Sequence, residues 1–143
     1  MHSWTDSEDP GIRYFSGTAT YQKVFTVENE DKEKDSFIDL GEVRDVGEVF
    51  VNGKSAGILW GKPFRINIDR LVKTGDNELK VKVVNMRINR LTGDMQLEPK
   101  DWYCRTNQLY MAGEVRPEGN EIFRIQISGL LGPVKLHFLT NNP

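Results

Sequence analysis

Residues 49–60 read VFVNGKSAGILW, two apolar runs separated by the pair Asn52-Gly53. Asparagine and glycine both tolerate positive φ angles, which a two-residue type I′ turn needs at its two central positions. An Asn-Gly pair between two apolar runs is a strong local signal for a β-hairpin. The stretch therefore predicts two antiparallel strands joined by a tight turn.

Apolar and polar residues also alternate elsewhere in the chain. The pattern is present in residues 19–27, 64–69, 77–84, 122–128 and 134–138. Successive side chains of a strand point to opposite faces, so each segment would cover a core on one side and meet water on the other. Parallel sheets between helices would need continuous apolar runs instead. The sequence therefore predicts an all-β fold, an antiparallel β-sandwich of about eight strands.

The length of 143 residues suits one domain. We expect residues 1–15 to form a lead-in segment and residues 16–143 to form a single β-sandwich domain. No long helix fits anywhere in this pattern. One helical turn is expected at Asp69–Gly75, with Asp69 as its N-cap and Gly75 as its stop.

Charge and hydropathy exclude several classes of partner. The formal charge is −2, the sequence pI is about 5.7, and basic residues are mixed with acids along the chain. A nucleic-acid partner usually requires a clustered basic face, so none is expected. No apolar run is long enough to span a membrane, and the N-terminus MHSWTDSEDP lacks the apolar core of a signal peptide. The single cysteine, Cys104, is expected to act as a small buried hydrophobe.

Catalytic and cofactor motifs are missing from the sequence. His2 lies at the N-terminus and His137 on an expected strand, and neither has the spacing of a metal ligand or of a triad base. Glycoside hydrolysis by this chain alone would need two loop carboxylates. The candidates are Asp94, Glu98, Asp101, Glu114 and Glu118, but 21 acidic residues scatter several into loops by chance. We therefore predict no catalytic residue, no metal ligand and no cofactor, although loop carboxylates and carbonyls could hold a structural calcium ion.

The stretch NMRINRLTGDMQLEPKDWYC, residues 85–104, breaks the alternation. Its turn-forming residues 92–94 and Pro99 predict that it leaves the sandwich instead of continuing as a strand. Sugar rings stack on aromatic side chains, and planar polar side chains bind their hydroxyl groups. This chemistry predicts a carbohydrate site formed by Trp60, Asn89, Arg90, Asp94 and Trp102. The alternative is structural: the two tryptophans would seal the sandwich, and Arg90 would pair with Asp94 to brace the loop.

Several spaced motifs resemble a known domain. They are SWTDSEDPGIRYFSGTATYQKVF, IDLGEVRDVGEVFVNGKSAGILWGKPFRINID, GDNELKVKVVNMRINRLTGD and SGLLGPVKL, in this order. Together they resemble the sugar-binding-type β-sandwich of bacterial glycoside hydrolases. The greatest resemblance is to the C-terminal sandwich of the α-L-rhamnosidase-like enzymes of family 106, and a more distant one is to the sugar-binding domain of family 2. The resemblance implies a galactose-binding-domain-like jelly roll.

The resemblance also implies a function. The chain would be a non-catalytic carbohydrate-binding accessory domain of a bacterial polysaccharide-degrading hydrolase. It would not be an enzyme on its own, and its partners would be a rhamnose- or galactose-containing polysaccharide and the catalytic barrel of the parent enzyme. The parent would work in the periplasm or outside the cell. Alternatively, the domain would be structural. It would pack against that barrel through residues 129–133, Met86, Met95 and Met111, and it could complete the barrel's active site.

Overall fold

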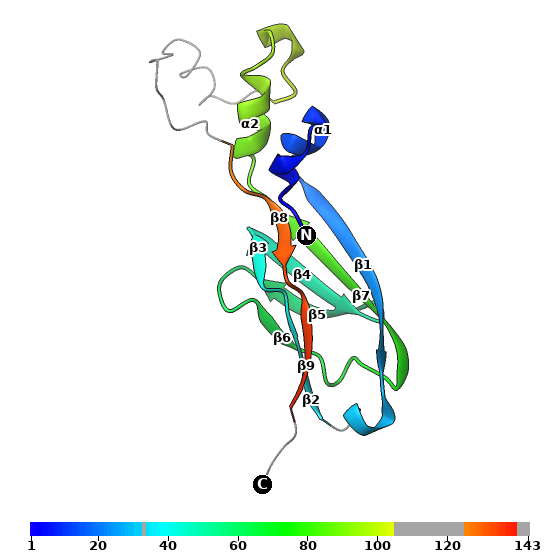
Figure 1. Ribbon diagram of the computed structural model, residues 1–143. Helices are drawn as coiled ribbons and strands as arrows, with labels where there is room; N and C mark the ends of the chain where they lie inside the picture. The colour runs from blue at the N-terminus through cyan, green and yellow to red at the C-terminus, as the bar shows by residue number, and fades with distance from the viewer. Residues whose placement is uncertain (33, 105–124, 140–143) are drawn as a thin grey trace.

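The structure is a computed structural model that describes residues 1–32, 34–104 and 125–139 (Figure 1). Within these ranges it contains nine strands, two short α-helices and three short 3-10 helices. The strands are β1 (Thr18–Val27), β2 (Asp35–Asp39), β3 (Glu42–Arg44), β4 (Val46–Val51), β5 (Lys54–Leu59), β6 (Arg65–Asn67), β7 (Gly75–Val84), β8 (Gly129–Gly132) and β9 (Lys135–Leu139). All strand pairs in the sheets are antiparallel, so the predicted all-β sandwich is confirmed.

One layer of the sandwich is a four-stranded sheet in the order β1-β7-β4-β5. The hairpin predicted from residues 49–60 joins β4 to β5, and both of its turn residues have positive φ, 51° at Asn52 and 78° at Gly53. The Asn52 amide donates to Oδ1 of Asn77, and its Oδ1 accepts from the Glu78 N–H. These bonds attach the turn to β7 and help fix the register of the sheet.

The other layer consists of shorter strands. β6, β2 and β9 form a three-stranded sheet, and β3 pairs with β8. β3 follows β2 along the chain and β8 precedes β9, so the two-stranded sheet extends the same β2–β9 path. Figure 1 shows both layers running along the length of the molecule.

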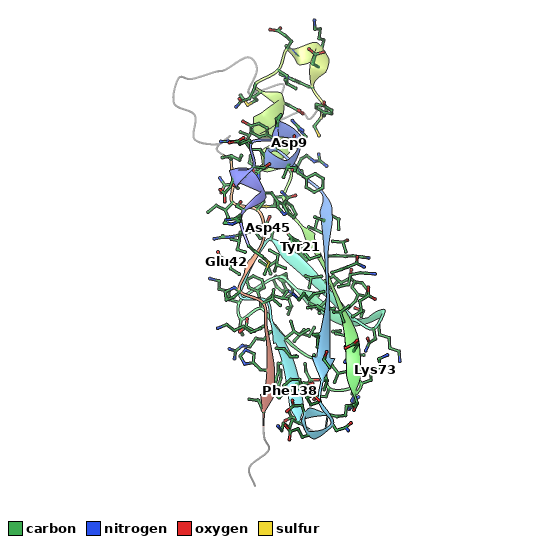
Figure 2. All side chains as sticks on the ribbon, turned by 45° about the vertical axis from the view of Figure 1, so that its right-hand side comes forward. Asp9, Tyr21, Glu42, Asp45, Lys73 and Phe138 are labelled. Atoms are coloured by element: carbon green, nitrogen blue, oxygen red, sulfur yellow. The ribbon has the colours of Figure 1, made fainter. Side chains whose placement is uncertain are left out.

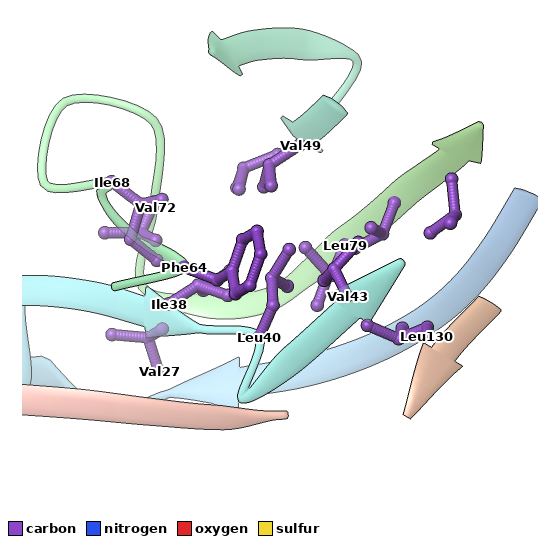
Figure 3. Close-up of a cluster of buried hydrophobic side chains, with 13 residues drawn as sticks. Val27, Ile38, Leu40, Val43, Val49, Phe64, Ile68, Val72, Leu79 and Leu130 are labelled. Carbon is purple, nitrogen blue, oxygen red and sulfur yellow. The ribbon is translucent and has the colours of Figure 1, made fainter. Parts of the chain in front are cut away.

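The core lies between the layers and consists of the inward residues of both. Figure 3 shows Val49 and Leu79 from the four-stranded sheet facing Ile38, Leu40 and Phe64 from the opposite side. These side chains are buried. Each contributes about 1.5–3 kcal/mol by leaving water, so the alternation read from the sequence also marks what holds the layers together.

The segment 122–128 is an exception to the predicted alternation. Residues 122–124 lie outside the described residues, and residues 125–128 are not a strand, so the predicted strand is wrong over this part. The backbone of Ser128 bonds elsewhere: its carbonyl accepts from the N–H of Trp4, and its N–H donates to Oγ of Ser3. The lead-in segment therefore takes up the hydrogen bonds that a neighbouring strand would have supplied.

The helices are short and lie mostly at one end of the sandwich. They are η1 (Trp4–Asp6), α1 (Pro10–Arg13), η2 (Asn29–Asp31), α2 (Ile88–Asp94) and η3 (Pro99–Asp101). Figure 1 shows α1 and α2 together beyond the end of β1 and β7. None of the helices in the described ranges is long and apolar enough to cross a membrane.

The helical turn predicted at Asp69–Gly75 is only partly correct. The N–H of Val72 bonds to the carbonyl of Ile68, which closes a single turn, and Gly75, with φ of 82°, is not its stop but the first residue of β7. Asp69 does not cap this turn, because its carboxylate accepts from the backbone N–H and the hydroxyl of Ser36. Asp69 therefore joins the turn to β2.

Candidate functional site

The predicted excursion at residues 85–104 is confirmed, and it contains a helix. Asn89, Arg90 and Asp94 lie on α2, at the end of the sandwich (Figure 1). The turn predicted at residues 92–94 is wrong, since these residues form the last turn of α2. Asp45 anchors the start of the excursion, where its Oδ2 accepts from the N–H of Met86 at 2.9 Å; Figure 2 labels Asp45 at this junction.

Asn89 is buried and uses its amide within the protein. Its Oδ1 accepts from the N–H of Gln126 at 2.7 Å, and its Nδ2 donates to the carbonyl of Gln126 at 2.7 Å and to Oγ of Ser128 at 2.8 Å. The side chain thus pairs with the backbone of residue 126 as a neighbouring strand would. These bonds leave Asn89 no polar group for a sugar.

Arg90 and Asp94 form an ion pair one turn apart on α2. Nε of Arg90 lies 3.0 Å from Oδ1 of Asp94, and the Asp94 side chain is fully buried. The two atoms are near enough for an ion pair, but neither makes a well-aligned hydrogen bond within the described residues. A buried pair of this kind braces the structure, and removing one partner would leave a buried charge uncompensated. The pairing predicted for Arg90 and Asp94 is therefore confirmed.

The second oxygen of Asp94 holds the chain that follows η3. Oδ2 accepts from the N–H of Cys104 at 2.8 Å. Asn89 holds Gln126 in the same way, so Cys104 and Gln126 are both bonded to side chains of one seven-residue helix. In the described part of the chain, α2 therefore acts as a clamp on two segments that are 22 residues apart in sequence.

Tyr103 is the aromatic residue that this clamp positions. The guanidinium carbon of Arg90 lies 4.7 Å from the centroid of the Tyr103 ring, while the residue is 77% exposed. A cation over a ring at this distance attracts it by about 0.5–1 kcal/mol at an exposed site. Tyr103 is not among the predicted site residues, although the adjacent Trp-Tyr pair and the arginine 13 residues earlier were the available signal.

The two predicted tryptophans lie in different places. Trp102 donates from Nε1 to the carbonyl of Leu97 at 3.2 Å, so it is held by the excursion itself and not by Arg90. Trp60 follows the edge strand β5 and is 80% exposed. Within the described residues, no hydrogen bond or ring contact joins Trp60 to the α2 residues.

Close packing explains why a glycine occupies the penultimate position of α2. A Cβ atom on Gly93 would lie 2.7 Å from Cβ of Tyr14 and 2.5 Å from a terminal nitrogen of Arg90. The lead-in segment therefore contacts α2 directly. Asn85 strengthens this contact, since its side chain accepts from the N–H of Gly17 and donates to the carbonyl of Phe15.

The candidate carboxylates do not form a catalytic pair in the described part of the chain. Glu98 and Asp101 are exposed, Asp94 is occupied by the clamp, and Glu114 and Glu118 lie outside the described residues. His137 lies on the expected strand, β9, and is half-buried. Over residues 1–32, 34–104 and 125–139, no group of three or more His, Cys, Asp or Glu side chains is arranged to hold a metal ion.

Similarity to known proteins supports the fold and the resemblance. No protein-family model matches the chain. A protein of Formosa agariphila named "Putative beta-glucuronidase" is 38% identical over 97% of this chain. The solved structure of a rhamnosidase from Novosphingobium sp. PP1Y matches 94% of the chain with a TM-score of 0.78 and 36% identity. A β-D-glucuronidase from Dictyoglomus thermophilum matches 59% of the chain with a TM-score of 0.55 and 30% identity.

The alignments with the Formosa protein and the Novosphingobium rhamnosidase cover almost all of this chain but only a small part of each relative. This chain spans only 13% of the Formosa protein and 12% of the Novosphingobium rhamnosidase. The chain therefore corresponds to a domain-sized part of proteins about eight times its length. The resemblance inferred from the sequence motifs is confirmed: over almost its whole length, the chain is similar to one β-sandwich portion of large glycoside hydrolases.

Proposed function

We propose that this chain is a non-catalytic accessory domain of a longer glycoside hydrolase and that it binds carbohydrate at its α2 end. The main support for carbohydrate binding is the Tyr103 side chain. Its ring is exposed to solvent, and the Arg90 guanidinium lies over it. A sugar ring has apolar faces that stack on such a ring, and a ring already held in place loses little freedom on binding. The ligand would be a rhamnose- or galactose-containing polysaccharide: the similarity to a rhamnosidase supports rhamnose, and the resemblance of the sequence motifs to galactose-binding-like domains supports galactose.

The roles of the predicted residues change under this proposal. Asp94 and Asn89 are positioning residues, because their polar atoms bond to the protein's own backbone. Arg90 positions the Tyr103 ring and can offer its terminal nitrogens to a hydroxyl group. Trp102 and Trp60 remain candidate stacking residues, with Trp102 nearer to Tyr103 in sequence and Trp60 more exposed.

The test is calorimetric titration of the 143-residue chain with rhamnose, galactose and pectin oligosaccharides. A shallow site for one or two sugars should bind with about −5 to −7 kcal/mol, which is a Kd between roughly 10 μM and 0.2 mM. Tyr103→Ala should remove most of the heat. Phe50→Ala is the matched control, since the Phe50 ring also lies under a cation, 4.8 Å from Nζ of Lys82, but on a strand far from α2 in sequence. Absence of heat with every sugar at millimolar concentration would refute carbohydrate binding.

The domain would not catalyse hydrolysis by itself. The same preparation should release no aryl alcohol from aryl rhamnosides or aryl glucuronides. Turnover by this chain alone, abolished by changing a carboxylate, would instead make it an enzyme. As part of a polysaccharide-degrading hydrolase, the domain would work in the periplasm or outside the cell.

A structural role is the second candidate, and an exposed apolar patch favours it. Ile58 and Val84 lie on the outer face of the four-stranded sheet, where their partners on β4 are Glu48 and Val46. Trp60 continues the same side of β5 by alternation, and Met86 follows Val84 along the chain. Apolar residues gathered in this way mark a contact surface. The occupant would be the catalytic barrel of the parent enzyme.

This patch differs from the interface that the sequence suggested. Leu130 of the stretch 129–133 is buried in the domain's own core, whereas Leu131 is half-buried and Pro133 is exposed, so only part of this stretch is available to an external partner. Met86 is exposed as expected, Met95 is half-buried, and Met111 lies outside the described residues. In the parent enzyme, Trp60→Ala and Ile58→Ser should lower stability or yield without changing sugar affinity. A change in affinity alone would count against the structural role.

A further inference from the structure

A groove lies on the outer face of the three-stranded sheet, away from α2. Its volume is about 280 Å³, and Phe37, Arg65, Asn67, His137 and Leu139 line it. The strand register accounts for this set, since Phe37 on the central strand β2 is paired with Asn67 on β6 and with His137 on β9. The half-buried Phe37 ring therefore lies in the middle row, with planar polar side chains on both sides.

We propose that this groove is a second carbohydrate site that takes one neutral sugar unit of a glycan. Ligand sites usually occupy about 300–1,000 Å³, so a groove just below this range suits one ring and not a long chain. Phe37 offers an aromatic surface for stacking, and Arg65 and Asn67 offer planar polar groups for hydroxyl groups. These three residues belong to two neighbouring strands, so the sheet itself sets their spacing.

The polar side chains of the groove are held in place by carboxylates. Nε of Arg65 donates to Oδ2 of Asp39 at 2.8 Å, and its terminal nitrogens make no hydrogen bond within the described residues. Nδ2 of Asn67 donates to Oδ2 of Asp69 at 2.6 Å, and Oδ1 of Asn67 accepts from the Asp69 N–H at 3.1 Å. Arg65 is thus oriented while its outer donors stay available. Such pre-organisation is what a weak sugar site needs.

Local charge favours a neutral sugar over a uronic acid. Asp39 on β2 is paired across the sheet with Arg65 on β6 and with Lys135 on β9, so two cationic side chains flank its carboxylate. Asp39 pairs with Arg65, Asp35 lies on the same face of β2, and Asp69 lies at the margin of the groove. Three carboxylates against two cations around the lining residues leave a net charge of −1, which weakly disfavours the carboxylate of a uronic acid, whereas a neutral ring meets no such cost.

This inference does not depend on the α2 site, and one experiment separates them. Backbone amide NMR spectra of the 143-residue chain should be recorded with increasing rhamnose, galactose or galacturonate at low salt. The inference predicts shifts of amides on β2, β6 and β9 with a neutral sugar and smaller shifts with galacturonate. Shifts confined to α2 and to the residues around Tyr103 would refute the groove and leave the proposed function standing. Shifts confined to the groove would support it and refute the α2 site.

Variants complete the test. Phe37→Leu keeps an apolar side chain without the ring, so the fold should survive while affinity for the neutral sugar falls about fivefold. Arg65→Ala should weaken binding by a similar factor. The matched controls are Phe50→Leu, on the outer face of the other sheet, and Arg44→Ala, an exposed arginine paired with Glu42 at 2.6 Å. Parent-like affinity in both Phe37→Leu and Arg65→Ala, or equal losses in the controls, would overturn the inference.

Discussion

The buried carboxylate of Asp94 accepts a hydrogen bond from the backbone N–H of Cys104 at 2.8 Å. Its other oxygen faces Nε of Arg90 at 3.0 Å. One side chain therefore links the helix of the excursion to the chain that leaves it. The same residue looked like a sugar ligand in the sequence, and its burial is the reason for assigning it to a brace instead.

Removing this carboxylate should be costly. Asp94→Ala leaves Arg90 without its partner and the Cys104 N–H without its acceptor, so we expect a loss of about 3–5 kcal/mol in the free energy of unfolding. The measurement is urea unfolding followed by tryptophan fluorescence. Glu42→Ala is the control: it breaks the exposed pair with Arg44 and should cost less than about 1 kcal/mol. Equal losses in the two variants would contradict the brace.

Asn89 should be needed for local order around Gln126. Asn89→Ala removes the acceptor for the Gln126 N–H and one of the donors to the Gln126 carbonyl, which also accepts from Oγ of Ser128, so we expect a cost of about 1 kcal/mol. Hydrogen exchange is the direct readout, and the Gln126 amide should exchange faster in the variant. Asn89→Asp keeps the acceptor, so protection of that amide should be largely retained. Unchanged exchange in Asn89→Ala would show that the bond is unimportant.

Gly93 should resist substitution even though alanine is the better helix former. A Cβ at this position would overlap Tyr14 and Arg90, and overpacking typically costs about 1–3 kcal/mol. Gly61→Ala is the matched control, because a Cβ there has no neighbour within 4 Å. Thermal unfolding of the two variants should separate them clearly. A Gly93→Ala protein as stable as the parent would mean that the lead-in segment does not pack on α2 this closely.

The strands were predictable from local pattern, but the excursion was only partly so. Alternation in residues 77–84 and the Asn52-Gly53 turn depend on rules that act within a few residues, and both are confirmed. The strand expected at 122–128 was wrong over residues 125–128 because the bonding partners of its backbone, Ser3, Trp4 and Asn89, lie far away in sequence. No local pattern contains that information.

Acid should weaken the β2–β6 side of the sandwich. The hydrogen bond from Arg65, with further effects of the Gly41 N–H and His137, lowers the pKa of Asp39 from its ordinary value of 3.8. Burial alone would raise the pKa of Asp69, but hydrogen bonds from Ser36 and Asn67 outweigh it and lower the pKa from 3.8. The folded protein thus binds these protons more weakly than the unfolded chain.

The pH window follows from that direction. The contribution of both carboxylates is complete above the unfolded pKa of about 3.9 and is lost as the pH falls through the lowered folded values. The free energy of unfolding, measured by urea titration between pH 6 and pH 2.5, should therefore fall below about pH 4. Asp39→Asn and Asp69→Asn should each reduce the slope, and the double variant should reduce it most. A slope that both single variants leave unchanged would assign the acid sensitivity to other groups.

The candidate site shows the same limit of local reasoning. The sequence identified α2 residues of the right chemistry, and their composition alone could not distinguish a ligand set from a brace. Asn89 and Asp94 are assigned to the brace because both side chains are buried. Their burial depends on the lead-in segment and on residues 126–128, which pack around α2. Tyr103 was missed because its exposure, and its place beside Arg90, arise only in the folded chain.

The most direct test of the account is the Arg90→Ala variant, measured for both unfolding and sugar binding. If Arg90 braces α2 and positions the Tyr103 ring, the free energy of unfolding should fall by about 3–5 kcal/mol, because the buried Asp94 carboxylate loses its partner, and any sugar affinity at the α2 end should weaken with it. A variant that unfolds like the parent but no longer binds would make Arg90 a direct sugar contact and contradict the brace. A variant that unfolds and binds like the parent would contradict both roles.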